Sequence, residues 1–125
     1  MEPKNKNKLE GSLAQLKEAI QAYRTSKGES ELPFLALSKA FEIAVEYTWR
    51  ELKVRVENDG LEAPSPKSAV KQAAKLGMIS EPETWINCID ARNNSVHDYF
   101  GISEEDYASL AEKFLVLASG LTKKQ

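Results

Sequence analysis

Apolar residues recur at intervals of three and four through most of the chain, the spacing of side chains on one face of an α-helix. The pattern begins at Leu9 and predicts an amphipathic helix that ends near Lys27 and Gly28. Its apolar positions are Leu9, Leu13, Leu16, Ile20 and Tyr23. Residues 1–8 precede the pattern, are mostly charged or polar, and are predicted to be disordered.

The longest periodic stretch predicts a second helix over residues 32–58, with Pro33 in its first turn and Asn58-Asp59-Gly60 as its stop. Trp49 broadens the apolar face of this helix. Its core positions are Leu37, Phe41, Ala44, Val45, Thr48, Leu52 and Val56. The charged residues of the other face are expected to be solvated, and they are Lys39, Glu42, Glu46, Arg50 and Glu57.

Serines followed by proline or by acidic residues predict the starts of the remaining helices. Ser65 is expected to cap a short helix that ends at Gly77, Ser80 to form a capping box with Glu83, and Ser103 to cap the last helix. The apolar stripe of the last helix is Tyr107, Leu110, Phe114, Leu117 and Leu121. Because no β-type alternation persists, residues 1–125 are predicted to form one all-α domain, an up-and-down bundle of about five helices related to the four-helix bundle.

Composition narrows the class of protein. The 125 residues, 42% apolar and 29% charged, suit one soluble domain, and the formal net charge of −2 argues against nonspecific binding to nucleic acid. The single Cys88 excludes an internal disulfide, is expected to be buried, and suits the cytoplasm, where we expect the protein to reside. No membrane span, zinc site or glycine-rich phosphate loop is found, so we expect no membrane association, metal or cofactor.

Candidate chemistry is concentrated in the stretch Ile89–Gly101, which is predicted to form the last turns of the fourth helix. It contains the only histidine, His97, together with Asp90, Arg92, Asn93, Asn94, Ser95 and Tyr99. At about 100° per residue, Arg92 and His97 lie about 140° apart on a regular helix. A second chain or a distorted last turn would therefore be needed to bring the two side chains together.

An imidazole beside a guanidinium suits phosphodiester chemistry without a metal. His97 is the candidate general acid and base, and Arg92 is the candidate ligand of the phosphate charge. Asn93 and Ser95 are candidates for positioning the substrate, and Asp90 for orienting the imidazole. A structural role stays open beside this one, because His97 also suits the end of a helix dipole and Arg92 also suits an ion pair with Asp90 or Asp98.

The spacing Arg92-x4-His97-x-Tyr99 resembles the R-x4-H-x-Y signature of HEPN domains, with Asn93 after the arginine as is common there. The segments Phe41–Lys53 and Ser65–Ala73, and Gly-Met-Ile at 77–79 followed by Trp85, resemble the nucleotidyltransferase substrate-binding branch of these proteins, which is related to HepT-type toxins. The resemblance covers nearly the whole chain.

The resemblance implies two alternative functions. In the first, the protein is a binding subunit that partners a minimal nucleotidyltransferase and holds nucleotide or RNA in a HEPN cleft. In the second, it is a metal-independent RNase toxin that acts through Arg92 and His97 and is silenced by adenylylation of Tyr99. Both imply a homodimer with the Arg92 helix at or near the interface, and whether the chain is an enzyme stays open.

Overall fold

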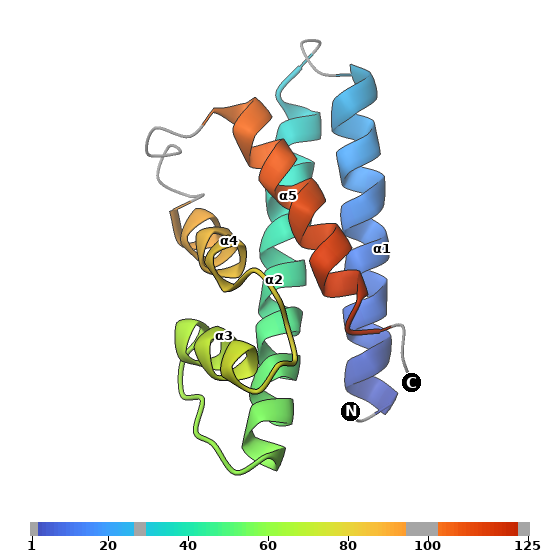
Figure 1. Cartoon of the computed structure of the whole chain (residues 1–125). Coiled ribbons are helices and arrows are strands. Elements are labelled where there is room, and N and C mark those ends of the chain that lie inside the picture. The colour runs from blue at the N-terminus through green and yellow to red at the C-terminus, as the bar shows by residue number, and fades with distance from the viewer. Residues whose placement is uncertain (1–2, 27–29, 95–102, 123–125) are drawn as a thin grey trace.

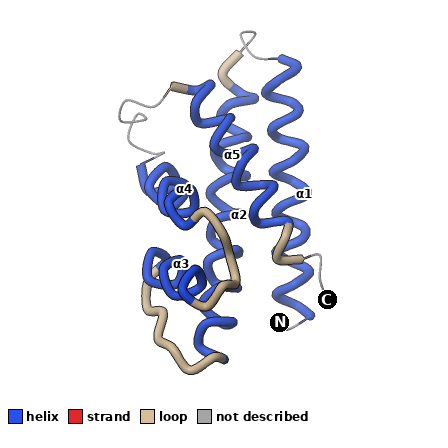
Figure 2. Tube along the Cα trace, in the orientation of Figure 1, coloured by secondary structure: helices blue, strands red, loops and turns tan. Residues whose placement is uncertain are grey.

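The computed structural model describes residues 3–26, 30–94 and 103–122, and these residues form five helices joined by loops (Figure 1, Figure 2). The helices are α1 (Pro3–Ser26), α2 (Leu32–Asn58), α3 (Pro66–Lys75), α4 (Pro82–Asn94) and α5 (Glu104–Ser119). The all-α prediction is confirmed. No helix in the described part of the chain is long and apolar enough to cross a lipid bilayer.

Helix α2 is the centre of the molecule, because it contacts each of the other four helices. Helices α1 and α2 run antiparallel along the long axis, and α5 crosses both of them (Figure 1). The shorter α3 and α4 are stacked beside α2 on the side away from α1, where Figure 1 shows them nearly end-on. The bundle therefore has α1 on one side of α2, and α3 with α4 on the other.

The core is built around a chain of aromatic rings that links α2, α4 and α5. Phe41 is fully buried and meets the rings of Tyr107 and Phe114 edge to face, at centroid distances of 5.2 and 5.6 Å. Tyr107 also contacts Phe34 at 5.3 Å, and Phe114 contacts Trp85 at 5.8 Å. Such edge-to-face pairs add to the stabilisation that comes from burying the rings. Phe114 thereby fixes α4 against α2 and α5.

Several helix ends lie where the sequence predicts them. Helix α2 spans the predicted residues 32–58. The Ser65 side chain accepts a hydrogen bond from the Ser68 backbone, and the Ser103 side chain accepts one from the Asp106 backbone at 3.0 Å, so both serines are N-caps. Gly77 follows α3 with a φ of +77°, a left-handed conformation that glycine adopts without strain.

Two predicted starts are wrong. Residues 3–8, which we expected to be disordered, belong to α1, because Pro3 is tolerated in a first turn and lysines extend an existing helix at little cost. Helix α4 begins after Glu81 rather than after Ser80. The Glu81 carbonyl accepts the first hydrogen bonds of the helix, whereas the Ser80 carbonyl accepts one from the Trp85 indole at 3.0 Å. The predicted box between Ser80 and Glu83 therefore does not form.

Candidate functional site

Arg92 lies in the last turn of α4 and points at the outer face of α2. Its Nη2 donates to Oε1 of Glu46 at 2.5 Å, and its Nη1 donates to Oδ1 of Asn93 at 3.2 Å. The Arg92 and Glu46 side chains are only 24% and 26% exposed. Arg92 is thus paired with an acid from a helix far away in sequence, and Asp90, a partner that the sequence suggested for it, instead binds Lys67.

Glu46 holds a second guanidinium with its other oxygen. Arg50, one turn further along α2, places Nε and Nη2 each 2.7 Å from Glu46 Oε2, while the Trp49 indole donates to Oε1 at 3.3 Å. Partial burial by itself would raise the pKa of Glu46. The hydrogen bonds from Arg50 and Trp49 and the charge of Arg92 outweigh that effect and lower the pKa, so Glu46 is a carboxylate at neutral pH.

These groups border a groove of about 360 Å³, which we call the α2–α4 groove. It is lined by Glu42, Ile43, Glu46, Tyr47, Arg50 and Arg92. Two guanidiniums at one wall suit the oxygens of a phosphate, and the Tyr47 ring with the Ile43 side chain offers an apolar surface for a base. The arrangement can therefore bind a phosphorylated ligand.

The other candidate residues fall into two groups. Asp90 Oδ1 lies 2.7 Å from Lys67 Nζ, an ion pair that joins α4 to α3 on a different side of α4 from Arg92. Asn93 is exposed beside Arg92 and accepts its hydrogen bond. Ser95, His97 and Tyr99 lie outside the described residues, so the structure brings together Arg92 and Asn93 alone from the predicted set.

Glu46 and Arg50 were predicted to lie on a solvated face, and that expectation is wrong for Glu46, which is partly buried under Arg92. The signal in the sequence is an acid and a base four residues apart, a spacing that is common on any exposed helix. Only the docking of α4 distinguishes this pair from Lys53 and Glu57 on the same helix, which form a similar ion pair at 2.7 Å.

Potential metal ligands are dispersed over the fold. In the described ranges, no three His, Cys, Asp or Glu side chains lie close enough together to hold a metal ion. Cys88 is 1% exposed, as expected, and burial raises the pKa of its thiol to about 12. It is therefore an unreactive core residue on the buried face of α4 and does not line the groove.

Comparison with known proteins agrees with the sequence resemblance. The family described as nucleotidyltransferase substrate binding protein like matches residues 4–124. The crystal structure of a protein from Thermus thermophilus has the same fold, with a TM-score of 0.70 and 27% sequence identity over 93% of this chain and 99% of that one. No curated protein was found to match the chain. The chain therefore belongs to the nucleotidyltransferase substrate binding protein-like family.

Proposed function

We propose that this protein is the substrate-binding partner of a minimal nucleotidyltransferase and that it holds the phosphates of nucleotide or RNA in the α2–α4 groove. The observation that carries the proposal is the placement of two arginines, Arg92 and Arg50, on the two oxygens of the Glu46 carboxylate at the wall of that groove. The family name supports the association with a nucleotidyltransferase.

Glu46 gives this site a defined geometry before any ligand arrives. Two guanidiniums side by side repel each other, and a carboxylate between them offsets that repulsion and fixes both side chains. A phosphate carries more charge and more acceptor oxygens than a carboxylate, so it can compete with Glu46 for the N–H groups of both arginines. The cost of ordering the arginines is then met in the free protein, which favours affinity.

A metal-independent RNase is the second candidate function. Arg92, the arginine of the R-x4-H-x-Y signature, is fixed by Glu46 at the wall of the groove, as a group that stabilises phosphate charge requires. His97 would act as the general acid and base, with Ser95 and Asn93 as supporting residues. In a homodimer with α4 near the interface, His97 of one copy would complete the site of the other.

Binding is tested with a fluorescent single-stranded RNA and with ATP, each titrated in the presence of a chelator. Replacing Arg92 by Ala removes a charge-assisted contact, so we expect the affinity to fall by about tenfold or more. Lys71→Ala is the matched control, because Lys71 is an exposed cation of α3 outside the groove. Equal losses in both variants would show nonspecific charge attraction and would contradict the proposal.

The same samples separate the two functions. Fragmentation of RNA by the wild type in chelator, abolished by His97→Ala and by Arg92→Ala, identifies the RNase. Binding without fragmentation identifies the binding subunit.

Co-expression with a nucleotidyltransferase tests the remaining prediction, that Tyr99 is adenylylated. An adenylyl mass increase that is lost in Tyr99→Phe would assign the modification to Tyr99.

A further inference from the structure

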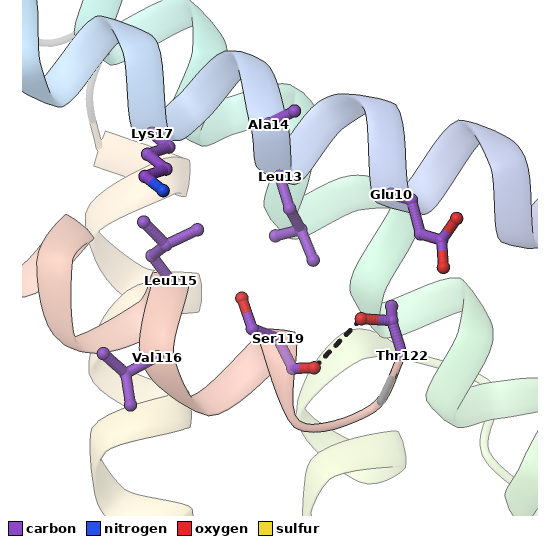
Figure 3. A pocket seen from close by; sticks show the side chains of 8 residues that line it. All are labelled: Glu10, Leu13, Ala14, Lys17, Leu115, Val116, Ser119 and Thr122. Carbon is purple, nitrogen blue, oxygen red and sulfur yellow. Dashed lines mark hydrogen bonds between the residues drawn. The ribbon is translucent and has the colours of Figure 1, made fainter. Parts of the chain in front are cut away.

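A second groove lies between α1 and the C-terminal half of α5, on the opposite side of the molecule from α4 (Figure 1). Its volume is about 510 Å³, and we call it the α1–α5 groove. Figure 3 shows the lining residues, which are Glu10, Leu13, Ala14, Lys17, Leu115, Val116, Ser119 and Thr122. Within the described chain, α1 contacts only α2 and α5, so this groove is separate from the site of Arg92.

The α1 side of the groove carries opposite charges at its two ends. Glu10, Ala14 and Lys17 follow one another at intervals of four and three residues and share one stripe of the helix. Figure 3 shows Glu10 near Thr122 and Lys17 above Leu115, with Leu13 between them. Among the residues that the structure describes, neither Glu10 nor Lys17 has an ion-pair partner, although both are exposed.

The α5 side of the groove has the apolar Leu115 and Val116 at one end and the polar Ser119 and Thr122 at the other. Val116 is 73% exposed, the largest exposed fraction among the large apolar side chains described, and Leu115 beside it is half-buried. On α1, a side chain at Gly11 would meet no atom within 4 Å, and Ala14 is exposed. Ala14 and Val116 both line the groove, and the small side chains on α1 leave room for another helix to approach.

We propose that the occupant of the α1–α5 groove is a second copy of this chain, docked across a two-fold axis near Ala14. Glu10 and Lys17 lie at equal distances on either side of the position between Leu13 and Ala14, about 10 Å apart along the helix. In an antiparallel pair of α1 helices, Glu10 of each copy lies beside Lys17 of the other. The stripe is therefore complementary to itself, as a two-fold interface requires.

The interface pairs two charges that have no ion-pair partner in the described ranges of the chain, and it covers an exposed apolar side chain. Both ion pairs form between copies, and Val116 of each copy is covered by the small residues of the other α1. A different protein would need a surface on which acidic, apolar and basic side chains follow one another in the order that complements Glu10, Ala14 and Lys17. A second copy of this chain already has that order. Because the α1–α5 groove and the α2–α4 groove lie on different sides of the molecule, a second copy docked in the first groove leaves the second one open.

Charge reversal tests the proposal in the full-length protein. Sedimentation equilibrium over a concentration series compares the wild type with Glu10→Lys, Lys17→Glu and the double variant. Each single change creates two like-charge contacts at a two-fold interface, so self-association at this face should weaken by about tenfold or more. The double variant restores opposite charges and should recover most of the wild-type association.

The outcomes are distinguishable from those of the α2–α4 site. If the α4 side also dimerises, the single variants reduce a tetramer to a dimer, and if it does not, they reduce a dimer to a monomer. RNA binding should be unchanged in all three variants, because neither Glu10 nor Lys17 lines that site. Val116→Asp gives an independent disruption without a change in Glu10 or Lys17. A wild-type stoichiometry that none of these variants changes, or a double variant as weak as the singles, would overturn the proposal.

Discussion

Glu46 is a single carboxylate that binds two arginines, one from its own helix and one from α4. It therefore has two effects with opposite consequences for ligand binding. It holds the guanidiniums in place, and it competes with a phosphate for their N–H groups. The balance between these effects can be measured at this one residue.

Glu46→Gln should lower the free energy of unfolding by about 1 kcal/mol, because the pairs are partly solvated, while raising the affinity for inorganic phosphate. Urea unfolding and a phosphate titration measure the two quantities. The lowered pKa of Glu46 means that its stabilisation is present above the ordinary carboxyl pKa and is lost as the pH falls through the native value. Glu57→Gln, which removes the comparable pair with Lys53, should leave phosphate affinity unchanged. A weaker affinity in Glu46→Gln would show that positioning outweighs competition.

Cys88 carries a stability prediction of its own. Its pKa is raised from an ordinary 9.0 to about 12 because burial disfavours the thiolate. Between these values the unfolded chain loses a proton that the native chain keeps, so stability falls as pH rises, by up to about 1.4 kcal/mol per pH unit. Cys88→Ala removes this dependence. Urea unfolding across a pH series should therefore show the wild type losing stability relative to the variant from about pH 9 upward, and parallel pH profiles would contradict the prediction.

At the scale of the candidate site, the sequence predicted Arg92 as a site residue but did not predict Glu46. The spacing from Arg92 to Tyr99 identified the end of α4, and Arg92 does line a groove. Glu46 was missed because its role depends on the docking of α4 onto α2, a contact between residues 46 positions apart. Helical periodicity sorts residues by face, and it does not indicate which exposed face another helix will cover.

At the scale of single helices, local signals predicted the ends that local chemistry determines. Ser65 and Ser103 cap their helices through hydrogen bonds within one turn. The predicted start of α4 was wrong because the Trp85 indole donates to the Ser80 carbonyl and because Glu81 adopts a positive φ of +55°. We attribute both features to the packing of Trp85 into the core. The buried face of α5 also differs from the predicted stripe. Ala108, Ala111 and Ala118 are fully buried where Leu110 and Leu117 were expected to be.

This rotation of α5 changes the expected cost of truncating its side chains. Phe114 is 1% exposed and touches both Phe41 and Trp85, so Phe114→Ala should cost roughly 3–5 kcal/mol. Leu110 is only partly buried at the edge of the core, and Leu110→Ala should cost about 1 kcal/mol. Urea denaturation of the two variants measures both values. Equal losses would mean that Leu110 lies in the core as the simple stripe predicts.

At the scale of the whole molecule, the side chains of two arginines join the long helices near their ends. Arg24 of α1 binds Glu112 of α5 through two hydrogen bonds of 3.0 Å and Glu105 through one of 2.6 Å. At the other end of α5, Arg55 of α2 donates to the Leu121 carbonyl at 2.8 Å and to Glu51 at 2.7 Å. Glu51 is fully buried, so this second junction places a charge inside the bundle.

Removing one member of a buried ion pair costs more than the pair contributes, because the remaining charge stays without full compensation in a poorly polar environment. Arg55→Ala should therefore lower the free energy of unfolding by roughly 3–5 kcal/mol and loosen the end of α5. The matched control is Lys53→Ala, since Lys53 likewise binds an acid four residues away and a backbone carbonyl, that of Ala63. Its acid, Glu57, is 46% exposed and can be hydrated, so the control should cost about 1 kcal/mol or less.

The double variant Arg55→Met with Glu51→Leu completes the comparison. It replaces the pair by apolar side chains of similar length, and buried pairs replaced in this way often lose no stability. We therefore expect it to be more stable than Arg55→Ala, by about 2 kcal/mol or more, in urea unfolding. Hydrogen exchange at the amides of Leu117 and Ala118 reports the junction itself, and it should speed up in Arg55→Ala more than in Lys53→Ala. If Arg55→Ala and Lys53→Ala were equally mild, Glu51 would be compensated by groups other than Arg55, and the junction would not depend on this arginine.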